Sequence, residues 1–273
     1  MDKESYIISK FDSKFIGDDG AVVGDFVYSK DIFAQDVHFK KEWLTLFQIS
    51  QKAMLVNISD AIAMNAKPLY ALIGAVIPKD FSKNDIDELS QGFLKTAKKF
   101  GVEIIGGDTT SGEKLVISIT IVAKKRKNTL KRAGLKEGDL LAFTGELGGS
   151  LKDLNKLFKG EQISKNSRFI APTLRGEFIK KSAKYLRCGL DISDGLSKDL
   201  SRLCKLANLG AKFMFNIDER VLCSGEEYEM LFAFDEANRD KNLKIAKKTD
   251  TKVTIFAKAV KGRYINRCKE HHF

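Results

Sequence analysis

The chain has 273 residues, of which 43% are hydrophobic and 30% charged, so it can bury a sizeable core and is not a disordered chain. Its 47 lysine and arginine residues outnumber its 36 acidic residues, which gives a formal net charge of +11. That charge favours anionic partners such as nucleotides, other phosphates, nucleic acid or acidic lipid, and it does not choose among them. The apolar stretch Tyr70–Pro78 is far shorter than the roughly 20 residues that a bilayer span needs, so we expect no membrane partner.

The cysteines stand far apart in the sequence, at Cys188, Cys204, Cys223 and Cys268. They form no C-x-x-C pair and follow no secretory leader, so the sequence suggests neither a disulfide framework nor a zinc site. We therefore expect a reduced chain located in the cytoplasm.

Regular elements in the first half are predicted from apolar spacing and from the residues that begin and end them. Thr45 and Gln48 match a capping box, which predicts a helix from there to about Ala66. Apolar residues at helical spacing predict a second helix over 86–100, which Gly101 ends. Apolar or alternating runs predict strands over 70–77, 102–105 and 115–122.

The second half has the same mixture of elements. We expect strands over 139–144, 213–217, 230–234 and 253–259, helices over 169–186 and from 196 to near Gly210, and a lysine-rich helical segment between the last two strands. Helices and strands without a strict parallel rhythm indicate the α+β class. The basic stretch Lys124–Arg132 is predicted to connect two domains, 1–126 and 127–273, although a solvated basic loop inside one domain would look the same.

Carboxylates in this basic chain gather in glycine-rich or strand-end turns. Asp60 instead lies within an apolar helix, where an unpaired carboxylate is costly to bury, so a cation should meet these acids. Mg²⁺ accepts such oxygen ligands while keeping waters and substrate phosphates in its shell, which indicates a polyphosphate site. Taken singly, each motif is more typical of a turn whose aspartate binds nearby backbone donors. The motifs are Gly17-Asp18-Asp19-Gly20, Ser29-Lys30-Asp31, Asn57-Ile58-Ser59-Asp60, Gly106-Gly107-Asp108-Thr109-Thr110 and Asp191-Ile192-Ser193-Asp194-Gly195.

Other nucleotide and hydrolase motifs are absent from the sequence. Glu113 stands between Gly112 and Lys114, so this stretch misses the phosphate-loop pattern by one residue. There is no G-x-G-x-x-G fingerprint after a strand, no H-E-x-x-H helix and no G-x-S-x-G elbow. Hydride transfer through that fingerprint and zinc hydrolysis therefore lose support. Serine hydrolysis also loses support, because the histidines that could act as a base are few: His38, His271 and His272.

Read in chain order, these motifs resemble the thiamine-monophosphate kinase family over most of the chain. The match also includes His38-Phe39, Leu196 after the Asp191–Gly195 motif, and Gly225-Glu226-Glu227-Tyr228-Glu229. The resemblance is closer than that to the wider superfamily of aminoimidazole ribonucleotide synthetase. It implies a two-domain α+β fold whose N-terminal domains pair in a homodimer, with ATP and several Mg²⁺ ions in a cleft between the domains.

The resemblance also implies roles for particular residues. His38 and Glu226 would face the substrate thiamine phosphate, and Gly107, Asp108, Arg132 and Ser193 would contact ATP. The residues implied as catalytic are Asp60, Asp108, Asp194 and Arg132. The Mg²⁺ ligands would be Asp19, Ser29, Asp31, Asp60, Asp108, Asp191 and Asp194. Without the resemblance, Glu226 is more typical of a solvated acid in an acidic run, and Arg132 of linker charge.

Phosphoryl transfer depends on positioning and charge neutralisation, and it needs no general base here because the acceptor phosphate oxygen is already ionised. Lys30 departs from the family, which has a threonine here that contributes to one Mg²⁺ site, so we expect fewer or differently arranged metals. Near the C-terminus, where the family places an aromatic residue against the substrate, Tyr264 is the one candidate, in a doubtful register.

Two alternative functions stay open at this stage. One is a related ATP-dependent enzyme of the same superfamily with another acceptor. The other is a non-catalytic protein that binds anions or nucleic acid through its basic surface. We do not expect nucleic acid, because aromatic residues do not interleave with the basic stretch as a single-strand stacking platform requires.

Overall fold

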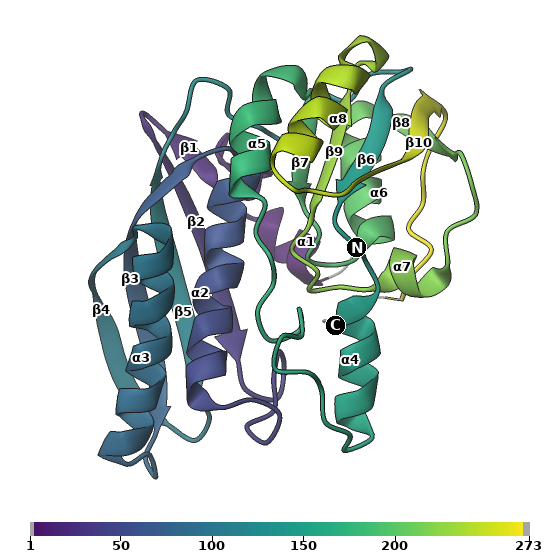
Figure 1. The fold of residues 1–273 in the computed structure, drawn as a ribbon. Helices are drawn as coiled ribbons and strands as arrows, with labels where there is room; N and C mark the ends of the chain where they lie inside the picture. The colour runs from purple at the N-terminus through teal and green to yellow at the C-terminus, as the bar shows by residue number, and fades with distance from the viewer. Residues whose placement is uncertain (1–2, 270–273) are drawn as a thin grey trace.

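The computed structural model describes residues 3–269 and contains two five-stranded sheets, each packed against helices (Figure 1). After the short helix α1 (Lys3–Ile8), the first sheet is built from β1 (Ala21–Val23), β2 (Phe26–Ala34), β3 (Lys67–Pro78), β4 (Glu103–Gly112) and β5 (Val116–Lys124). Its strand order is β1-β2-β5-β3-β4, and all neighbours are antiparallel except β3 and β4. The sequence predicts β3, β4 and β5, but not β1 or β2, and β4 extends through the Gly106–Thr110 motif, which we expected to be a turn.

Two helices cover one face of the first sheet, α2 (Leu46–Ala63) and α3 (Lys83–Phe100). Both begin with capping boxes, and the one at Thr45 and Gln48 confirms the sequence prediction. Helix α3 ends at Gly101, whose φ of 65° is the left-handed conformation that glycine adopts without strain. The alternating burial of β5 fits a sheet with one covered face, because Ile117, Ile119 and Ile121 point toward the helices.

The second sheet has the order β7-β9-β6-β10-β8 and is antiparallel throughout. Its strands are β6 (Leu140–Thr144), β7 (Cys188–Asp191), β8 (Leu209–Phe213), β9 (Met230–Phe234) and β10 (Val253–Lys261). Helix α6 (Leu196–Ala207) packs in one hydrophobic cluster with this sheet, whereas α5 (Gly176–Ser182) and α8 (Arg239–Lys248) pack in a second cluster. Helices and strands are mixed along the chain without a strict parallel order, which confirms the α+β class.

Several elements differ from the sequence prediction. The helix expected over 169–186 is shortened to α5, because residues 169–175 form an irregular segment whose apolar side chains join the core of the first sheet. The strand expected over 213–217 ends at Phe213, and the helix expected to end near Gly210 stops at Asn208, whose φ is 54°. Helices α1, α4 (Gly149–Phe158) and α7 (Glu219–Cys223) and strand β7 were not expected.

Helix α2 is buried on nearly every side, which is unusual for a helix that covers a sheet. One side packs on β2 and β5, and another contacts β7 and α5 of the second sheet. Its sequence is accordingly apolar around the whole helix and has little amphipathic character. The polar residues inside it, Lys52, Asn57 and Ser59, are themselves buried and must find partners within the protein.

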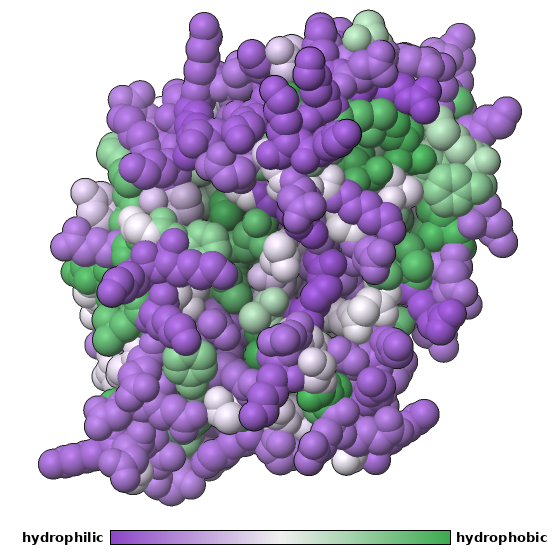
Figure 2. Space-filling view, in the orientation of Figure 1, coloured by the Kyte–Doolittle hydropathy of each residue, from purple (hydrophilic) through white to green (hydrophobic). Residues whose placement is uncertain are grey.

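Hydrophilic side chains dominate the face of the molecule shown in Figure 2, as a lysine-rich chain predicts. Within residues 3–269, no helix has the length and apolar character needed to cross a membrane.

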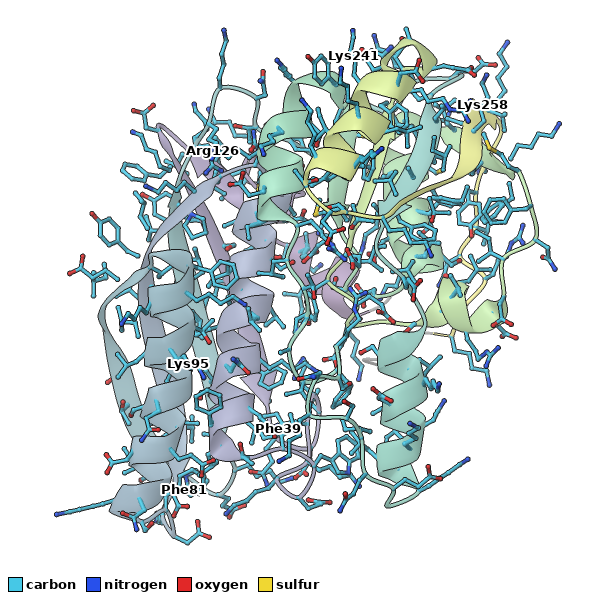
Figure 3. All side chains as sticks on the ribbon, viewed as in Figure 1. Phe39, Phe81, Lys95, Arg126, Lys241 and Lys258 are labelled. Carbon is cyan, nitrogen blue, oxygen red and sulfur yellow. A yellow bond between two sulfur atoms is a disulfide. The ribbon has the colours of Figure 1, made fainter. Side chains whose placement is uncertain are left out.

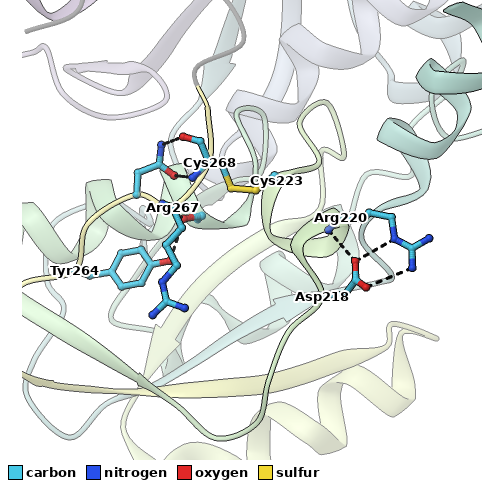
Figure 4. The surroundings of a disulfide bond; sticks show 8 residues. Asp218, Arg220, Cys223, Tyr264, Arg267 and Cys268 are labelled. Carbon is cyan, nitrogen blue, oxygen red and sulfur yellow. Dashed lines mark hydrogen bonds and ion pairs between the residues drawn. A yellow bond between two sulfur atoms is a disulfide. The ribbon is translucent and has the colours of Figure 1, made fainter.

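A disulfide joins Cys223, at the end of α7, to Cys268 near the C-terminus (Figure 4). The expectation of a fully reduced chain is therefore wrong for this pair. The two residues are 45 positions apart in the sequence, and only the folding of the C-terminal segment along α6 and α7 brings their Cα atoms to 5.4 Å. The other two cysteines, Cys188 and Cys204, are buried, and burial raises the pKa of their thiols to about 12 and about 11.

Reduction of this disulfide is expected to lower the free energy of unfolding by about 4 kcal/mol, the loop-closure value for the 45 residues that it spans. Urea titrations of the wild type with and without a phosphine reductant measure the difference. Cys188 and Cys204 are free thiols and offer the reductant no S–S bond, so it should act on the Cys223–Cys268 pair. The Cys268→Ser variant is the control, because its midpoint should not respond to reductant. Equal midpoints for the reduced and oxidised wild type would contradict this prediction.

Candidate active site

Carboxylates singled out in the sequence meet where α2, β2, β7 and the loop before β1 come together. Asp31 lies on β2 beside α2, and its backbone N–H donates to Asn57 Oδ1 at 2.8 Å. Asp60 lies one turn further along α2, and Asp191, the last residue of β7, accepts a hydrogen bond from Ser59 Oγ. Residues from both sheets therefore form one acidic cluster, which we define as Asp19, Asp31, Asp60 and Asp191.

The electrostatics of this cluster are unfavourable for negative charge. Burial raises the pKa of Asp60 well above its ordinary value, and the neighbouring charges of Asp31, Asp191 and Asp19 raise it further. Burial likewise raises the pKa of Asp191, with Asp19 as the next cause. A cation placed among these carboxylates would relieve both the desolvation and the mutual repulsion.

Arg132 is bonded directly to the acidic cluster through Asp19. Its Nε and Nη2 atoms donate to Asp19 Oδ1 at 2.9 and 2.6 Å, and its backbone N–H donates to Asp18 Oδ1 at 2.8 Å. Burial raises the pKa of Asp19, and the charge and hydrogen bonds of Arg132 oppose that rise. Arg132 is thus held at the edge of the cluster, and the expectation that a cation meets these acids is confirmed for Asp19.

Ser29 and Lys30 point to opposite faces of β2, as alternation along a strand requires. Ser29 is buried and donates to the backbone oxygen of Asn57 at 3.4 Å, on the side of the acidic cluster. Lys30 is exposed, and its Nζ donates to Thr120 Oγ1 at 3.4 Å on the uncovered face of the sheet. The substitution of lysine for threonine therefore places no ammonium among the carboxylates.

Asp194 lies at the start of α6, in a charged group that adjoins the acidic cluster, because the charge of Arg202 also acts on Asp19. Its carboxylate pairs with Arg202 Nη2 at 2.5 Å and with Lys198 Nζ at 3.4 Å. Arg202 also binds Asp199, whose pKa burial raises to about 7. Gly195, next to Asp194, has a φ of 102° and lies so close to the end of α7 that a Cβ would sit 3.3 Å from the Leu222 oxygen.

Gly107 and Asp108 are not brought into the acidic cluster within one chain. Register pairs Asp31 with Ile119, Ile119 with Ile73, and Ile73 with Gly107, so β4 lies three strand spacings, about 14 Å, from β2. Asp108 is exposed on this edge strand, where its carboxylate accepts the N–H of Thr109 at 2.9 Å. Gly107 has a φ of 153°, and a Cβ there would lie 1.8 Å from the oxygen of Ile73.

A cavity of about 290 Å³ lies between the loop before α2, helix α4, and the segments that contain Ser193 and Glu226. Figure 3 shows Phe39, one of its lining residues, beside the end of α2 and on the side toward α4. The cavity brings together residues that the sequence analysis assigned to substrate and nucleotide: His38, Ser193, Asp194 and Glu226. His38 Nδ1 accepts the N–H of Ala34 at 3.1 Å, which places the proton of the neutral ring on Nε2.

Glu226 is paired with a lysine of α2 that the sequence analysis did not identify. Its Oε2 accepts from Lys52 Nζ at 2.8 Å, and Lys52, on α2, is fully buried with its ammonium 3.8 Å from the centre of the Phe169 ring. The backbone N–H of Glu226 donates to the Ser193 oxygen at 2.7 Å, so the Asp191–Gly195 and Gly225–Glu229 segments are joined directly. A solvated acidic run is therefore the wrong interpretation of this segment.

The other two acids of this segment are buried and structural. Glu227 Oε1 accepts the N–H groups of Gly148 and Ser150 at 2.8 and 3.0 Å, and so it caps the N-terminus of α4. Glu229 accepts from Arg175 Nε and Nη2, both at 2.7 Å, and from Arg168. These bonds hold α4 and the irregular segment 159–175 over the cavity.

The donor set of the acidic cluster fits Mg²⁺. Within residues 3–269, no three acidic, histidine or cysteine side chains lie close enough to surround a single ion by themselves. Mg²⁺ does not require that, because it keeps several waters and is bound by one or two carboxylates together with substrate phosphates. Asp60 and Asp191, whose pKa values are raised first by burial and then by neighbouring carboxylates, are suitable oxygen ligands for such an ion.

Lys52 and Arg202 could have been recognised from the sequence. Lys52 interrupts an apolar helix just as Asp60 does, and a buried charge of either sign requires a partner. Arg202 follows Asp199 at a spacing of three residues on a helix, where opposite charges meet. Tyr264, the expected aromatic contact to substrate, lies elsewhere: its hydroxyl is 3.0 Å from Ser197 Oγ and its ring packs near Phe213.

The chain is similar to known proteins in sequence and in fold. Residues 17–124 match the family model described as AIR synthase related protein, N-terminal domain. The thiamine-monophosphate kinase of Buchnera aphidicola is 33% identical over 268 residues, covering 86% of this chain and 81% of the relative. That of Nitrosopumilus maritimus is 28% identical over 239 residues, covering 81% and 77%. The solved structure of AaThiL complexed with AMPPCP and TMP superposes with a TM-score of 0.86 at 24% identity, covering 99% of this chain and 96% of that one.

The raised pKa of Asp60 predicts that Asp60→Asn stabilises the metal-free protein. In the unfolded chain Asp60 ionises near its ordinary pKa of 3.8, whereas the native state resists ionisation. Stability contributed by the protonated form is therefore lost as the pH rises through the native pKa. The variant should gain on the order of 1 kcal/mol at about pH 8, and the gain should vanish below about pH 4.

Thermal unfolding in a chelator across this pH range measures the effect. Asp25→Asn is the control, because the hydrogen bond from Lys124 lowers the pKa of Asp25, so removing its charge should bring no gain. A metal-free Asp60→Asn protein no more stable than the wild type at pH 8 would contradict the prediction.

Proposed function

The chain belongs to the thiamine-monophosphate kinase family, and from this we propose that it transfers the γ-phosphoryl group of ATP to thiamine phosphate, giving thiamine diphosphate and ADP. The observation that carries the proposal is that two segments link the acidic cluster to the cavity: Asp191 belongs to the cluster, whereas Ser193 and Glu226, which are joined by a backbone hydrogen bond, line the cavity. Residues from both sheets supply carboxylates for metal and phosphate, while the cavity beside them holds His38 and Glu226. A protein that used its basic surface to hold nucleic acid would have no need of this buried acidic site.

The proposed reaction breaks the bond between the γ-phosphorus and the β–γ bridging oxygen of ATP. It forms a bond from that phosphorus to a phosphate oxygen of thiamine phosphate. The attacking oxygen is already anionic at neutral pH, so no protein group has to remove a proton. The obstacle is repulsion between two anions, and the protein's task is to hold both in line while their charges are neutralised.

Asp19, Ser29, Asp31, Asp60 and Asp191 are proposed to hold Mg²⁺, which when bound neutralises phosphate charge and aligns the two substrates. Asp194 is proposed to act on the same phosphates from the start of α6. Because Lys30 points away from this cluster, its side chain removes no ligand from the metal sites formed by these carboxylates. The earlier expectation of fewer metals is therefore not carried into the proposal.

Arg132 and Ser193 are proposed to contact ATP. The guanidinium of Arg132 is fixed by Asp19 at the edge of the acidic cluster, where it can offset triphosphate charge. Gly107 and Asp108 are proposed for the same nucleotide, although they lie on β4, across the sheet from Asp31. A site that includes Asp108 must extend along the sheet edge or take this residue from a second copy of the chain.

His38 and Glu226 are proposed to bind thiamine phosphate. The Nε2–H of His38, oriented by the bond that Nδ1 makes to Ala34, can donate to the substrate phosphate. Glu226 can accept from the amino group of the pyrimidine or offset the positive thiazolium. Lys52 is then a positioning residue, because its ammonium holds the Glu226 carboxylate in place.

Incubation of the protein with ATP and thiamine phosphate, with thiamine diphosphate separated and identified, tests the activity directly. Product should form with Mg²⁺ and fall to background in a chelator. Asp60→Asn is expected to lower the rate at least about 100-fold, since it removes a proposed metal ligand, whereas Asp25→Asn on the surface should leave it unchanged. Full activity in Asp60→Asn would remove Asp60 from the site, and absence of product with ATP still bound would point to another acceptor.

The division into domains 1–126 and 127–273 and the homodimer are also proposed. The face of the first sheet that α2 and α3 do not cover has exposed apolar side chains: Tyr28 at 40%, Ile32 at 55%, Tyr70 at 37% and Leu72 at 39%. Register places them in adjacent rows across β2 and β3, on either side of β5. A two-fold pairing of this face with itself would bury these residues.

The dimer proposal predicts that Ile32→Glu gives a monomer, because two buried carboxylates would face each other across a symmetric interface. Light scattering after size-exclusion chromatography measures the mass. Ile86→Glu is the matched control, since Ile86 on α3 is 44% exposed and lies on the opposite side of the sheet. A wild type that is monomeric at all concentrations, or a dimer unaffected by Ile32→Glu, would contradict the proposal.

A further inference from the structure

One wall of the cavity that holds His38 and Glu226 is aromatic. Trp43 lies on the loop before α2, and its ring meets that of Phe158 edge to face with centroids 5.1 Å apart. Phe169 lies behind Trp43, at 6.4 Å. Phe158, the last residue of α4, is 63% exposed, which is a large exposure for an aromatic ring at the mouth of a cavity. Neither Trp43 nor Phe158 belongs to the motifs that the sequence analysis singled out.

This aromatic pair already accommodates a cation. The ammonium of Lys40 lies 5.3 Å from the centroid of Trp43 and 5.8 Å from that of Phe158. Both distances are within the range of cation–π attraction. Lys40 also lines the cavity, so the cation sits at the place where a ligand would enter.

The position of the pair is fixed by residues near the opposite wall. Glu227, next to Glu226, caps the N-terminus of α4, and Ser224 Oγ accepts the N–H of Leu151 at 3.0 Å. Helix α4 therefore carries Phe158 to the cavity from a base anchored in the segment that holds Glu226. Because α4 is anchored next to Glu226 at one end and carries Phe158 at the other, it fixes the distance between Phe158 and Glu226.

We propose that Trp43 and Phe158 form the subsite for the positively charged thiazolium ring of thiamine phosphate, an inference that rests on the proposed function. The quaternary nitrogen of this ring has no hydrogen to donate, so it is recognised through its charge, which aromatic faces attract. The ring takes the place of the Lys40 ammonium, and the substrate phosphate extends toward His38 and Asp194 on the same cavity. These two aromatic residues do what Tyr264 cannot, because Tyr264 is held against Ser197 and Phe213.

Trp43 is the only tryptophan in the sequence, so intrinsic fluorescence reports on this subsite alone. The probes are thiamine phosphate and deazathiamine phosphate, in which carbon replaces the quaternary nitrogen and the ring is neutral. Thiamine phosphate is expected to change the emission saturably and to bind the wild type about tenfold more tightly than the neutral analogue. Equal affinity for the two probes, or binding without any change in emission, would overturn the subsite.

Variants separate this subsite from the fold and from the chemistry. Phe158→Leu is expected to raise the KM for thiamine phosphate about tenfold and to abolish the preference for the charged ring. The KM for ATP and the melting temperature should stay unchanged, since Phe158 is exposed. Trp43→Phe should retain the preference and Trp43→Leu should lose it. The matched control is Phe81→Leu, because the ring of Phe81 also carries a lysine ammonium, that of Lys41 at 4.8 Å, on the surface near α3.

The outcomes distinguish the subsite from the proposed function. If the wild type makes thiamine diphosphate but Phe158→Leu and Trp43→Leu keep the wild-type KM and preference, the subsite is wrong and the kinase activity stands. If the wild type neither binds thiamine phosphate nor converts it, both proposals fail together. Loss of preference in the cavity variants with none in Phe81→Leu supports the subsite.

Discussion

Helix α2 carries charged and polar groups into a region that is closed to water on nearly every side. These groups must find partners inside the protein, and several of those partners lie at the contact between the two sheets. Lys52 is satisfied by Glu226, Asn57 by the backbone of β2, and Ser59 by Asp191. A buried polar group without a partner costs up to a few kcal/mol, so the bonds of Lys52 and Ser59, which reach the second half of the chain, also fix how the second sheet docks on the first. Asp60 is the exception, because its neighbours Asp31 and Asp191 are like-charged.

That exception gives the site its chemistry. The same docking that satisfies α2 brings Asp191 to Asp60 and sets Glu226 beside the cavity, so the acidic cluster and the substrate cavity are assembled by one set of contacts. Cations of the protein flank the cluster without filling it, with Arg132 on Asp19 and Arg202 on Asp194. Charge is left unbalanced at the centre, where metal and triphosphate together can neutralise it.

The irregular segment 159–175 after α4 packs mainly on the first sheet, and its Phe169 lines the cavity. Phe169 and Ile170 join the hydrophobic core of the first sheet, and Phe169 also stacks under the Lys52 ammonium. Arg168 and Arg175 bind Glu229 and tie this segment to β9. A helix here could not place these side chains against two different sheets, which accounts for the failure of the helical prediction over 169–186.

The sequence by itself determined the capped helix from Thr45, most strands, the α+β class and the identity of the motif residues, because these depend on local spacing and capping. It could not determine that β4 continues through Gly107 and Asp108, since glycines in a strand are tolerated only where a neighbouring strand approaches closely. Only the tertiary structure decided which acids meet, that Asp108 lies apart from Asp31, that Glu227 and Glu229 are buried, and that Cys223 pairs with Cys268. Such contacts join residues far apart in the chain, and their energies depend on burial that no local pattern records.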